Sequence, residues 1–126
     1  MRILLHPEIS RDLSLCRKKK WYNGLEEELD GIYRLLTIDK CLPGQSPMKS
    51  MGSEWVNKVL HARILLPKEN LGGRKGARIV YVFDEDRCRV LYVGGHRDKR
   101  YDDSRSVTAM ILERLKEPAY LEWIEN

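Results

Sequence analysis

A dense cluster of chemically capable side chains directly follows the apolar run CRVLYV. Its members are one imidazole, three cations and one phenol: His96, Arg97, Lys99, Arg100 and Tyr101. An imidazole exchanges a proton near neutral pH, and a guanidinium holds phosphate oxygens with a planar fork of N–H donors. The cluster therefore indicates a site that binds an anion and moves protons at the end of a buried strand.

Two further arginines lie in segments whose apolar residues alternate with a period of two. In residues 58–67, one face of the expected strand is apolar, and the other carries His61 and Arg63. In residues 77–83, Arg78 lies on the less aromatic of the two faces. A hairpin would place Arg63 and Arg78 side by side, which favours a convergent cationic site. The alternative is that each is a strand-end cation whose head reaches water.

Positive charge is concentrated in the middle of the chain. The 126 residues carry a net charge of +4, whereas residues 58–101 alone hold eleven Lys and Arg against five Asp and Glu. Scattered cations usually form a solvated surface, but their concentration in one segment favours a polyanionic partner. Residues 102–126 are acidic by comparison, with six Asp and Glu against three Lys and Arg.

Hydrophobic periodicity outlines one α+β domain over residues 1–126. We expect strands at 2–5, 58–67, 77–83 and 88–95, and helices at 7–19, 23–37 and 104–117. Residues 38–54 are rich in Pro, Gly and Ser, which predicts a long loop. The order β-α-α-β-β-β, followed by a C-terminal helix, predicts helices packed on one face of an antiparallel sheet. The other face of the sheet would then be left for function.

Local signals set the expected boundaries of these elements. Asn23 is a candidate N-cap for the second helix, and either Ser104 or Ser106 is a candidate N-cap for the last one. The pair Gly94 and Gly95 is expected to form a β-bulge that resets the register of the last strand.

Other classes of protein are disfavoured by composition. The three cysteines, Cys16, Cys41 and Cys88, lack CxxC spacing, so we expect buried or half-buried thiols, with no disulfide and no metal site. No apolar run approaches the length of a membrane span, and the apolar part of MRILLHPE is too short for a signal peptide. We expect a cytoplasmic protein that needs no cofactor and contacts no membrane.

Three stretches of the chain resemble the RelE/ParE superfamily of toxins from type II toxin–antitoxin systems. They are HPEISRDL, ARILLPKENLGGRKGARIVYVFDED and VLYVGGHRDKRYDD, so the resemblance covers residues 1 to about 102. The family's Gly-x-Arg-x-x-Tyr strand is matched by Gly76, Arg78 and Tyr81. Its Gly-His-Arg-x-x-x-Tyr ending is matched by Gly95, His96, Arg97 and Tyr101. The resemblance implies the RelE-like microbial RNase fold.

The resemblance also implies a function. The RelE branch cuts messenger RNA, often on the translating ribosome, and a cognate antitoxin protein holds it inactive. The ParE branch binds DNA gyrase and largely lacks the residues of the cleavage site. The cluster that ends at Tyr101 makes this chain more similar to the RelE branch. Three interpretations remain open: an endoribonuclease toxin, a gyrase-binding toxin, and an inactive toxin-fold protein that only binds a partner.

An RNA-cleaving site assigns roles to particular residues. The expected catalytic residues are Arg63, Arg78, His96, Arg97 and Tyr101. The arginines would stabilise the charge of the phosphorane, and His96 would give or take a proton. Because cations surround it in sequence, the Tyr101 phenol should become more acidic and act as a base, or else stack on a nucleobase. The expected RNA-binding residues are Lys58, His61, Lys68, Arg74, Lys75, Lys99 and Arg100.

The C-terminal extension, residues 103–126, goes beyond the end that is typical of the RelE branch. Its amphipathic helix would pack on the core, or its acidic residues would fold over the basic face.

Overall fold

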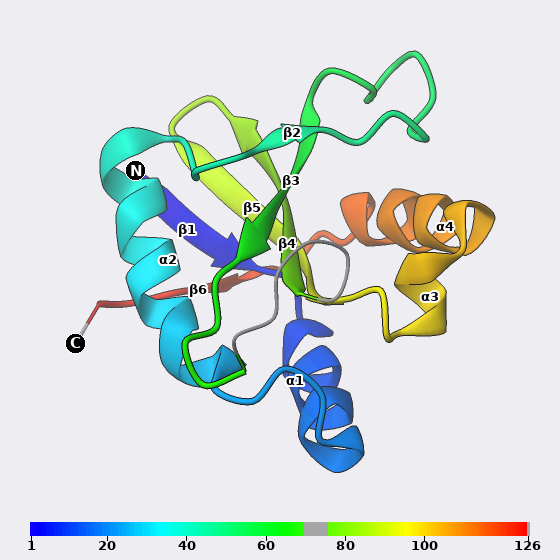
Figure 1. Cartoon of the computed structure of the whole chain (residues 1–126). Helices are drawn as coiled ribbons and strands as arrows, with labels where there is room; N and C mark the ends of the chain where they lie inside the picture. The colour runs from blue at the N-terminus through cyan, green and yellow to red at the C-terminus, as the bar shows by residue number, and fades with distance from the viewer. Residues whose placement is uncertain (70–75, 126) are drawn as a thin grey trace.

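The computed structural model describes residues 1–69 and 76–125 (Figure 1). In chain order the elements are β1 (Arg2–Leu5), α1 (Ile9–Lys19), α2 (Leu25–Asp39), β2 (Ser46–Pro47), β3 (Val59–Ile64), β4 (Ala77–Asp84), β5 (Arg87–Gly95), α3 (Lys99–Asp102), α4 (Ser104–Leu115) and β6 (Leu121–Glu122). Every strand and helix that we expected occurs, and β2, α3 and β6 are additional. Within the described ranges, no helix is long and apolar enough to span a bilayer. Arg74 and Lys75 lie outside these ranges.

The strands form one mixed sheet in the order β2-β3-β4-β5-β1-β6. The expected antiparallel meander of β3, β4 and β5 is present, but β1 pairs in parallel with β5, with Ile3 opposite Cys88. The expectation of a purely antiparallel sheet is therefore wrong. The chain reaches β5 from β1 through two helices and the meander, and a connection of that length permits parallel pairing. β6 pairs antiparallel with the outer edge of β1.

Helices α1 and α2 cover one face of the sheet, where the larger apolar core lies. The helices contribute Ile9, Cys16, Leu25, Leu29, Tyr33 and Leu36, and the meander contributes Ala62, Ile64, Ala77, Ile79, Tyr81, Cys88, Val90 and Val93. These strand residues follow the predicted alternation in β3 and β4, because side chains two positions apart lie on the same face. Cys16 and Cys88 are buried as expected, whereas Cys41 is exposed, and all three thiols are free.

The second face of the sheet is also covered, contrary to our expectation. Its core contains Met48, Met51, Val59, Val80, Val82, Leu91, Tyr92, Tyr101, Val107 and Ile111. Val107 and Ile111 come from α4, so the C-terminal extension packs on the sheet through its apolar side. In Figure 1, α2 lies to the left of the sheet and α4 to its right. The second face is therefore covered at least in part by α4 and by the segment that holds Met48 and Met51.

A β-bulge lies within β5, but not at the two glycines. Val80 pairs with Tyr92 and Tyr81 with Val90, so Leu91 is the extra residue. The bulge lets Leu91 and Tyr92 both join the core of the second face. Gly95 is needed for another reason: a Cβ there would overlap the Tyr22 hydroxyl and lie 2.9 Å from the Gly76 carbonyl oxygen.

The helix caps differ from those expected. Gly24, in the left-handed region with φ of 89°, caps α2 in place of Asn23. Asp103 caps α4 in place of Ser104 or Ser106, and its carboxylate accepts a hydrogen bond from the Ser106 backbone N–H at 2.8 Å. Asp98 caps the short helix α3 in the same manner through the Arg100 N–H at 3.0 Å. Two aspartates thus cap the helices on either side of the turn that ends α3, the helix that holds Lys99, Arg100 and Tyr101.

Candidate functional site

The two strand arginines lie directly opposite one another. Arg63 of β3 pairs with Arg78 of β4, as the alternation predicted. Arg63 is exposed, whereas Arg78 is 8% exposed and donates from Nη1 to the carbonyl oxygens of Gly76 and Ala77, each at 3.2 Å. Burial and the neighbouring charge of Arg63 lower the pKa of Arg78, which remains a cation at neutral pH. Two guanidiniums side by side favour the binding of an anion.

His61 lies at the centre of the site and joins residues from three elements. Its Nε2 is 3.1 Å from Ser46 Oγ, because Ser46 of β2 is the cross-strand partner of His61. Its Nδ1 is 3.3 Å from the Tyr101 hydroxyl. Burial lowers the pKa of His61, and the nearby charges of Arg78 and His96 lower it further, so this imidazole is neutral at neutral pH.

Tyr101 is a buried phenol, which corrects the expected role. Its exposed fraction is 5%, and its ring stacks on Tyr92 with centroids 5.1 Å apart. Burial raises the pKa of Tyr101 to about 12, in spite of the charge of Arg78. The expectation of a more acidic phenol is wrong, since burial outweighs the neighbouring cations. Tyr101 is therefore available as a hydrogen-bonding partner of His61, but neither as a base nor as a stacking platform for RNA.

The second imidazole, His96, lies on the other side of Tyr101. Its Nδ1 is 2.9 Å from a carboxylate oxygen of Asp102, and its ring contacts the Tyr101 ring edge-on at 5.0 Å. Asp102 also has a further interaction. Both histidines thus contact the same tyrosine, and each has a separate hydrogen-bonding partner that orients its ring.

Arg97 lies beside Tyr22 of the α1–α2 connection. Its guanidinium is 5.4 Å from the centre of the Tyr22 ring, and its backbone N–H donates to the Tyr22 hydroxyl at 2.9 Å. Tyr22 itself adopts a positive φ of 53° and is fully buried. The structure therefore places Arg63 directly opposite Arg78, and it places Arg97 against the ring of Tyr22.

A groove of about 540 Å³ opens beside these residues, between α2 and β3. Ile32 and Leu35 of α2 form an apolar wall, and Ser46, His61, Arg63 and Arg78 form the polar end. An elongated ligand with an anionic group and an apolar or aromatic part would fit such a groove. Ser46 was not anticipated, because a strand of two residues leaves no recognisable periodicity in the sequence.

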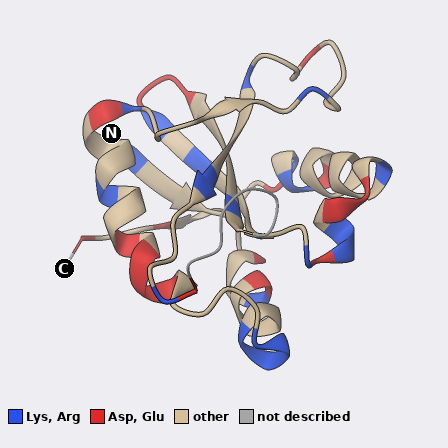
Figure 2. Cartoon of the chain, in the orientation of Figure 1, with Lys and Arg blue, Asp and Glu red and all other residues tan. Residues whose placement is uncertain are grey.

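The expected RNA-binding lysines that the structure describes have different surroundings. Lys68 lies 3.7 Å from Glu27 of α2, and Lys58 lies over the Trp55 ring at 5.6 Å. Lys99 is exposed on α3. Figure 2 shows a further group of cations at the end of α1, away from the sheet, where Arg17, Lys18 and Lys19 occupy the last turn. Positive charge is therefore dispersed beyond the site.

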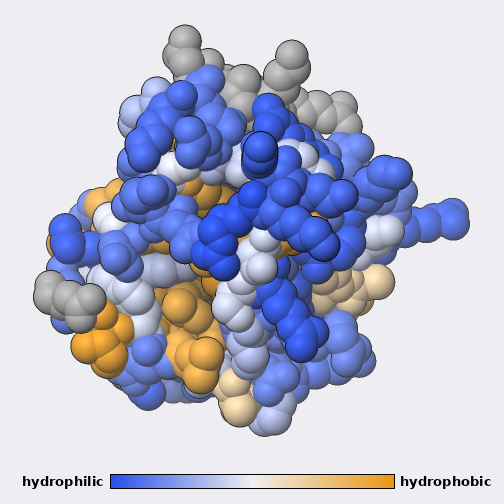
Figure 3. All heavy atoms as spheres, turned by 90° about the horizontal axis from the view of Figure 1, so that it is seen from below, coloured by the Kyte–Doolittle hydropathy of each residue, from blue (hydrophilic) through white to orange (hydrophobic). Residues whose placement is uncertain are grey.

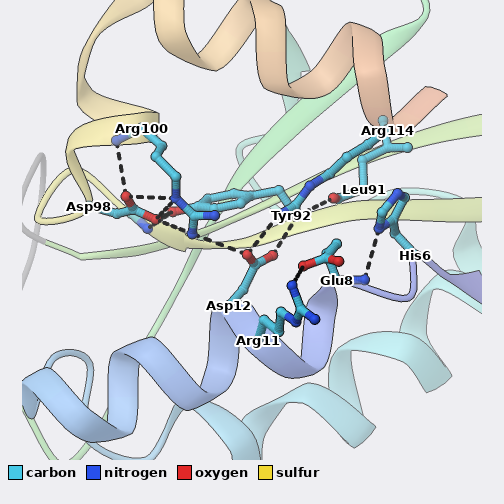
Figure 4. Close-up of polar contacts among 10 residues, drawn as sticks. His6, Glu8, Arg11, Asp12, Leu91, Tyr92, Asp98, Arg100 and Arg114 are labelled. Carbon is cyan, nitrogen blue, oxygen red and sulfur yellow. Dashed lines mark hydrogen bonds and ion pairs between the residues drawn. The ribbon is translucent and has the colours of Figure 1, made fainter. Parts of the chain in front are cut away.

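Arg100 is held by carboxylates, which corrects its expected role as an RNA-binding residue (Figure 4). It lies 2.7 Å from Asp98 and 3.2 Å from Asp12, whose side chain is buried. Although burial alone would raise the pKa of Asp98, hydrogen bonds from Arg100 and its backbone bring it below the ordinary value. Neutralised in this manner, Arg100 fixes the start of α3.

The same network reaches the C-terminal helix (Figure 4). Arg114 of α4 forms two hydrogen bonds to Asp12 of α1, at 2.6 and 2.9 Å, and a third to the carbonyl of Leu91 at 2.9 Å. The Tyr92 hydroxyl donates to Asp98 at 3.0 Å. Burial raises the pKa of Asp12, and the two guanidiniums oppose that shift. This buried network is the physical link between the extension and the site, and the sequence offered no signal for it.

A second groove of about 840 Å³ lies between the end of α1 and the start of α2. Its lining includes Arg17 and Lys20 but also Glu26 and Glu27, so charges of both signs face it. Figure 3, a view from below, shows a largely hydrophilic surface in which smaller apolar patches lie. The described lining of this second groove lacks an imidazole, whereas His61 lines the first groove, and we assign the second groove no chemistry.

Comparisons with protein-family models, with curated proteins and with solved structures found no match to this chain. Within residues 1–69 and 76–125, no group of three or more His, Cys, Asp or Glu side chains is placed to hold a metal ion.

Proposed function

We propose that this protein is a toxin of a type II toxin–antitoxin system, and that it cleaves messenger RNA by using the 2′-hydroxyl of the RNA as the nucleophile. The proposal combines the resemblance to the RelE branch with the geometry of the site. Its substrate would be an RNA backbone, either free or on the translating ribosome. Its resting partner would be a cognate antitoxin.

One observation carries the proposal: an imidazole and two guanidiniums line one groove, and a second imidazole contacts the same tyrosine as the first. His61 and Arg63 come from β3, Arg78 from β4 and His96 from the end of β5. RNA cleavage without a metal needs groups that transfer protons to and from oxygen, and groups that stabilise negative charge on phosphorus. These four side chains provide both kinds of group.

The arginines would act on the phosphate. Arg63 and Arg78 each present several N–H donors, and a guanidinium stays charged through the reaction. As the 2′-oxygen attacks, the non-bridging oxygens gain charge, and the fixed cations stabilise that charge more than they stabilise the ground state. Removal of one such interaction typically costs about 10²- to 10³-fold in rate.

The imidazoles would move the protons. One takes the proton of the 2′-hydroxyl while the 2′-oxygen bonds to phosphorus, and the other returns a proton to the 5′-oxygen as its bond to phosphorus breaks. The products are a 2′,3′-cyclic phosphate and a 5′-hydroxyl. Tyr101 would serve this chemistry by holding His61, since its hydroxyl is 3.3 Å from His61 Nδ1.

The antitoxin would have to cover the groove and neutralise its cations. An acidic or amphipathic segment of the antitoxin fits that requirement. Co-expression of the chain with the product of a neighbouring gene should give a stable complex that does not cleave RNA. Unimpaired growth of cells that contain the folded chain alone would contradict this part of the proposal.

The decisive experiment incubates the purified chain with a short RNA, and with ribosomes translating the same sequence, in the presence of EDTA. We expect fragments that end in a 2′,3′-cyclic phosphate, and no cleavage where the 2′-hydroxyl is replaced by hydrogen. The Arg78→Ala variant should cleave about 10²- to 10³-fold more slowly, and Arg87→Ala, at the opposite end of β4 and β5, should keep the wild-type rate. Intact RNA in both assays, together with inhibition of DNA gyrase by the chain, would favour the ParE-like alternative.

A further inference from the structure

The hydrogen bonds of the two histidines differ in a manner that assigns each a separate role. The partner of His96 Nδ1 is the Asp102 carboxylate, at 2.9 Å. The partner of His61 Nδ1 is the Tyr101 hydroxyl, at 3.3 Å. An ionised carboxylate accepts hydrogen bonds and cannot donate, whereas a phenol does both. The two partners therefore select different tautomers of the neutral imidazoles.

At His96 the carboxylate decides the tautomer. Since Asp102 can only accept, the neutral ring must carry its proton on Nδ1, and Nε2 then has a free lone pair. A carboxylate that orients an imidazole in this manner also stabilises the imidazolium that forms when Nε2 takes a proton. The charged and titratable groups around His96 are Asp102 and Tyr101 of α3 and His61 of β3.

At His61 the buried phenol decides the tautomer. Tyr101 is 5% exposed, and among the described residues its hydroxyl has one hydrogen-bonding partner, His61 Nδ1. A buried O–H without an acceptor is costly, so the phenol donates to Nδ1 and the ring carries its proton on Nε2. Ser46 Oγ, 3.1 Å from Nε2, accepts a hydrogen bond from that N–H, and Ser46 lines the groove.

We propose that His96 is the general base for the 2′-hydroxyl, with Asp102 as its positioning residue, and that His61 presents an N–H to the substrate, with Tyr101 as its positioning residue. This inference rests on the function proposed above. Ser46 Oγ occupies the place where a substrate oxygen would accept the His61 proton. Asp102 was absent from the residues expected on sequence grounds.

Each proton in the proposed reaction has a donor and an acceptor. The 2′-oxygen loses its proton to His96 Nε2 and bonds to phosphorus, while the bond from phosphorus to the 5′-oxygen breaks. The reacting form of His61 is its imidazolium, a minor form at neutral pH because burial lowers the pKa of His61. In that form the Tyr101 hydroxyl accepts from Nδ1–H, and the 5′-oxygen takes the Nε2 proton, which leaves His61 neutral. His96 then releases its proton to solvent, and His61 takes one up. No oxidant, reductant or further reactant is needed.

The first arm of the test does not depend on RNA cleavage. ¹⁵N NMR of the free protein, labelled at histidine, reports which nitrogen of each neutral ring carries the proton. We expect the Nδ1–H form for His96 and the Nε2–H form for His61. In Asp102→Asn the amide can donate to Nδ1, so His96 should move to the Nε2–H form. A wild-type His96 already in the Nε2–H form would overturn the assignment, whether or not the protein cleaves RNA.

The second arm separates positioning from binding. Asp102→Asn removes a negative charge near an anionic substrate, so KM should stay constant or fall, while kcat should fall by about 10²- to 10⁴-fold. Asp102→Glu, which keeps an acceptor-only carboxylate, should recover part of kcat. Asp39→Asn, at the exposed end of α2, is the matched control. If Asp102→Asn retains the wild-type kcat in an active enzyme, His96 is not the base. If the wild type does not cleave RNA, the proposed function and the catalytic roles of both histidines fail together, whereas the tautomers still test which partner orients each ring.

Discussion

Two pairs of arginines have opposite surroundings. Arg63 and Arg78 line a groove, and the contacts of Arg78 include two backbone carbonyls. Arg100 and Arg114 share the buried carboxylate of Asp12. Among the described residues, Arg63 has no carboxylate within ion-pair distance, whereas Arg114 makes two hydrogen bonds to one.

The partner of a cation, and not its place in a basic segment, decides what the cation can bind. A guanidinium that already shares a carboxylate has little attraction left for phosphate, but it can join elements that are distant in sequence. Arg114 joins α4 to α1 in this manner. A guanidinium beside a second cation raises the local potential and favours an anionic ligand. We therefore expect Arg100 and Arg114 to stabilise the fold, and we expect Arg63 and Arg78 to bind an anion.

The largest expected effect is on stability, in the buried pair. Asp12→Asn leaves Arg114 buried without its carboxylate, which should lower the free energy of unfolding by about 3–5 kcal/mol. Urea unfolding followed by circular dichroism measures this change, with Asp39→Asn as the exposed control. A loss below about 1 kcal/mol, the range of exposed ion pairs, would break the contrast between the two pairs.

The second effect is on catalysis, in the groove. Arg78→Ala should lower the rate of RNA cleavage by about 10²- to 10³-fold, and Arg78→Lys should recover little, because an ammonium lacks the planar fork. Single-turnover cleavage measures the rate, with Arg87→Ala as the control. Arg87 pairs with Asp84 at the far end of the sheet. Full activity of Arg78→Ala would show that the phosphate binds elsewhere.

A smaller effect concerns pH, because the buried His6 lies beside one arginine pair and the half-buried His61 lies beside the other. Burial lowers the pKa of His6, next to Arg114, and also that of His61, next to Arg78. As the pH falls, histidines in the unfolded chain therefore bind protons first, near the ordinary histidine pKa of about 6.5. The stability that the two neutral histidines contribute is fully present above that pH, and it is lost as the pH falls toward their lowered pKa values.

Unfolding free energies measured between about pH 7 and pH 5 test this expectation. His6→Gln should flatten the pH dependence more than His61→Gln, since His6 is 5% exposed and accepts the Glu8 N–H at 2.9 Å, a bond that protonation would break. Equal slopes in the wild type and both variants would refute the lowered pKa values.

The smallest expected effect is on the salt dependence of binding. Each cation that contacts single-stranded RNA contributes about 0.7 to the slope of log affinity against log salt. Arg63→Ala should reduce the slope by that amount, and Arg87→Ala should leave it unchanged. A 2′-O-methyl RNA that resists cleavage permits the measurement by fluorescence anisotropy. A slope that Arg63→Ala does not alter would remove Arg63 from the binding surface.

Much of the fold was predictable because its signals are local. The alternation of apolar residues in β3 and β4 placed Ala62 and Ile79 in the larger core and set Arg63 beside Arg78. The register follows from the pleat, since a slip of one residue would expose a whole face. The helical spacing of α1 and α2 was equally clear. What these patterns could not indicate was the second core, because the face with Val80 and Leu91 is covered by a helix from the extension.

The meander, the helical hairpin and the opposition of Arg63 and Arg78 could be predicted from the residues alone, because each depends on periodicity or on a short turn. The parallel pairing of β1, the acceptors of Arg100 and Arg114, and the contacts of His61 could not, because the residues involved are far apart along the chain. Arg114 meets Asp12 from 102 positions away, and Tyr101 meets His61 from 40. Burial then changes the chemistry, as in Tyr101, whose surrounding cations in sequence suggested an acidic phenol and whose packing makes it a weak acid.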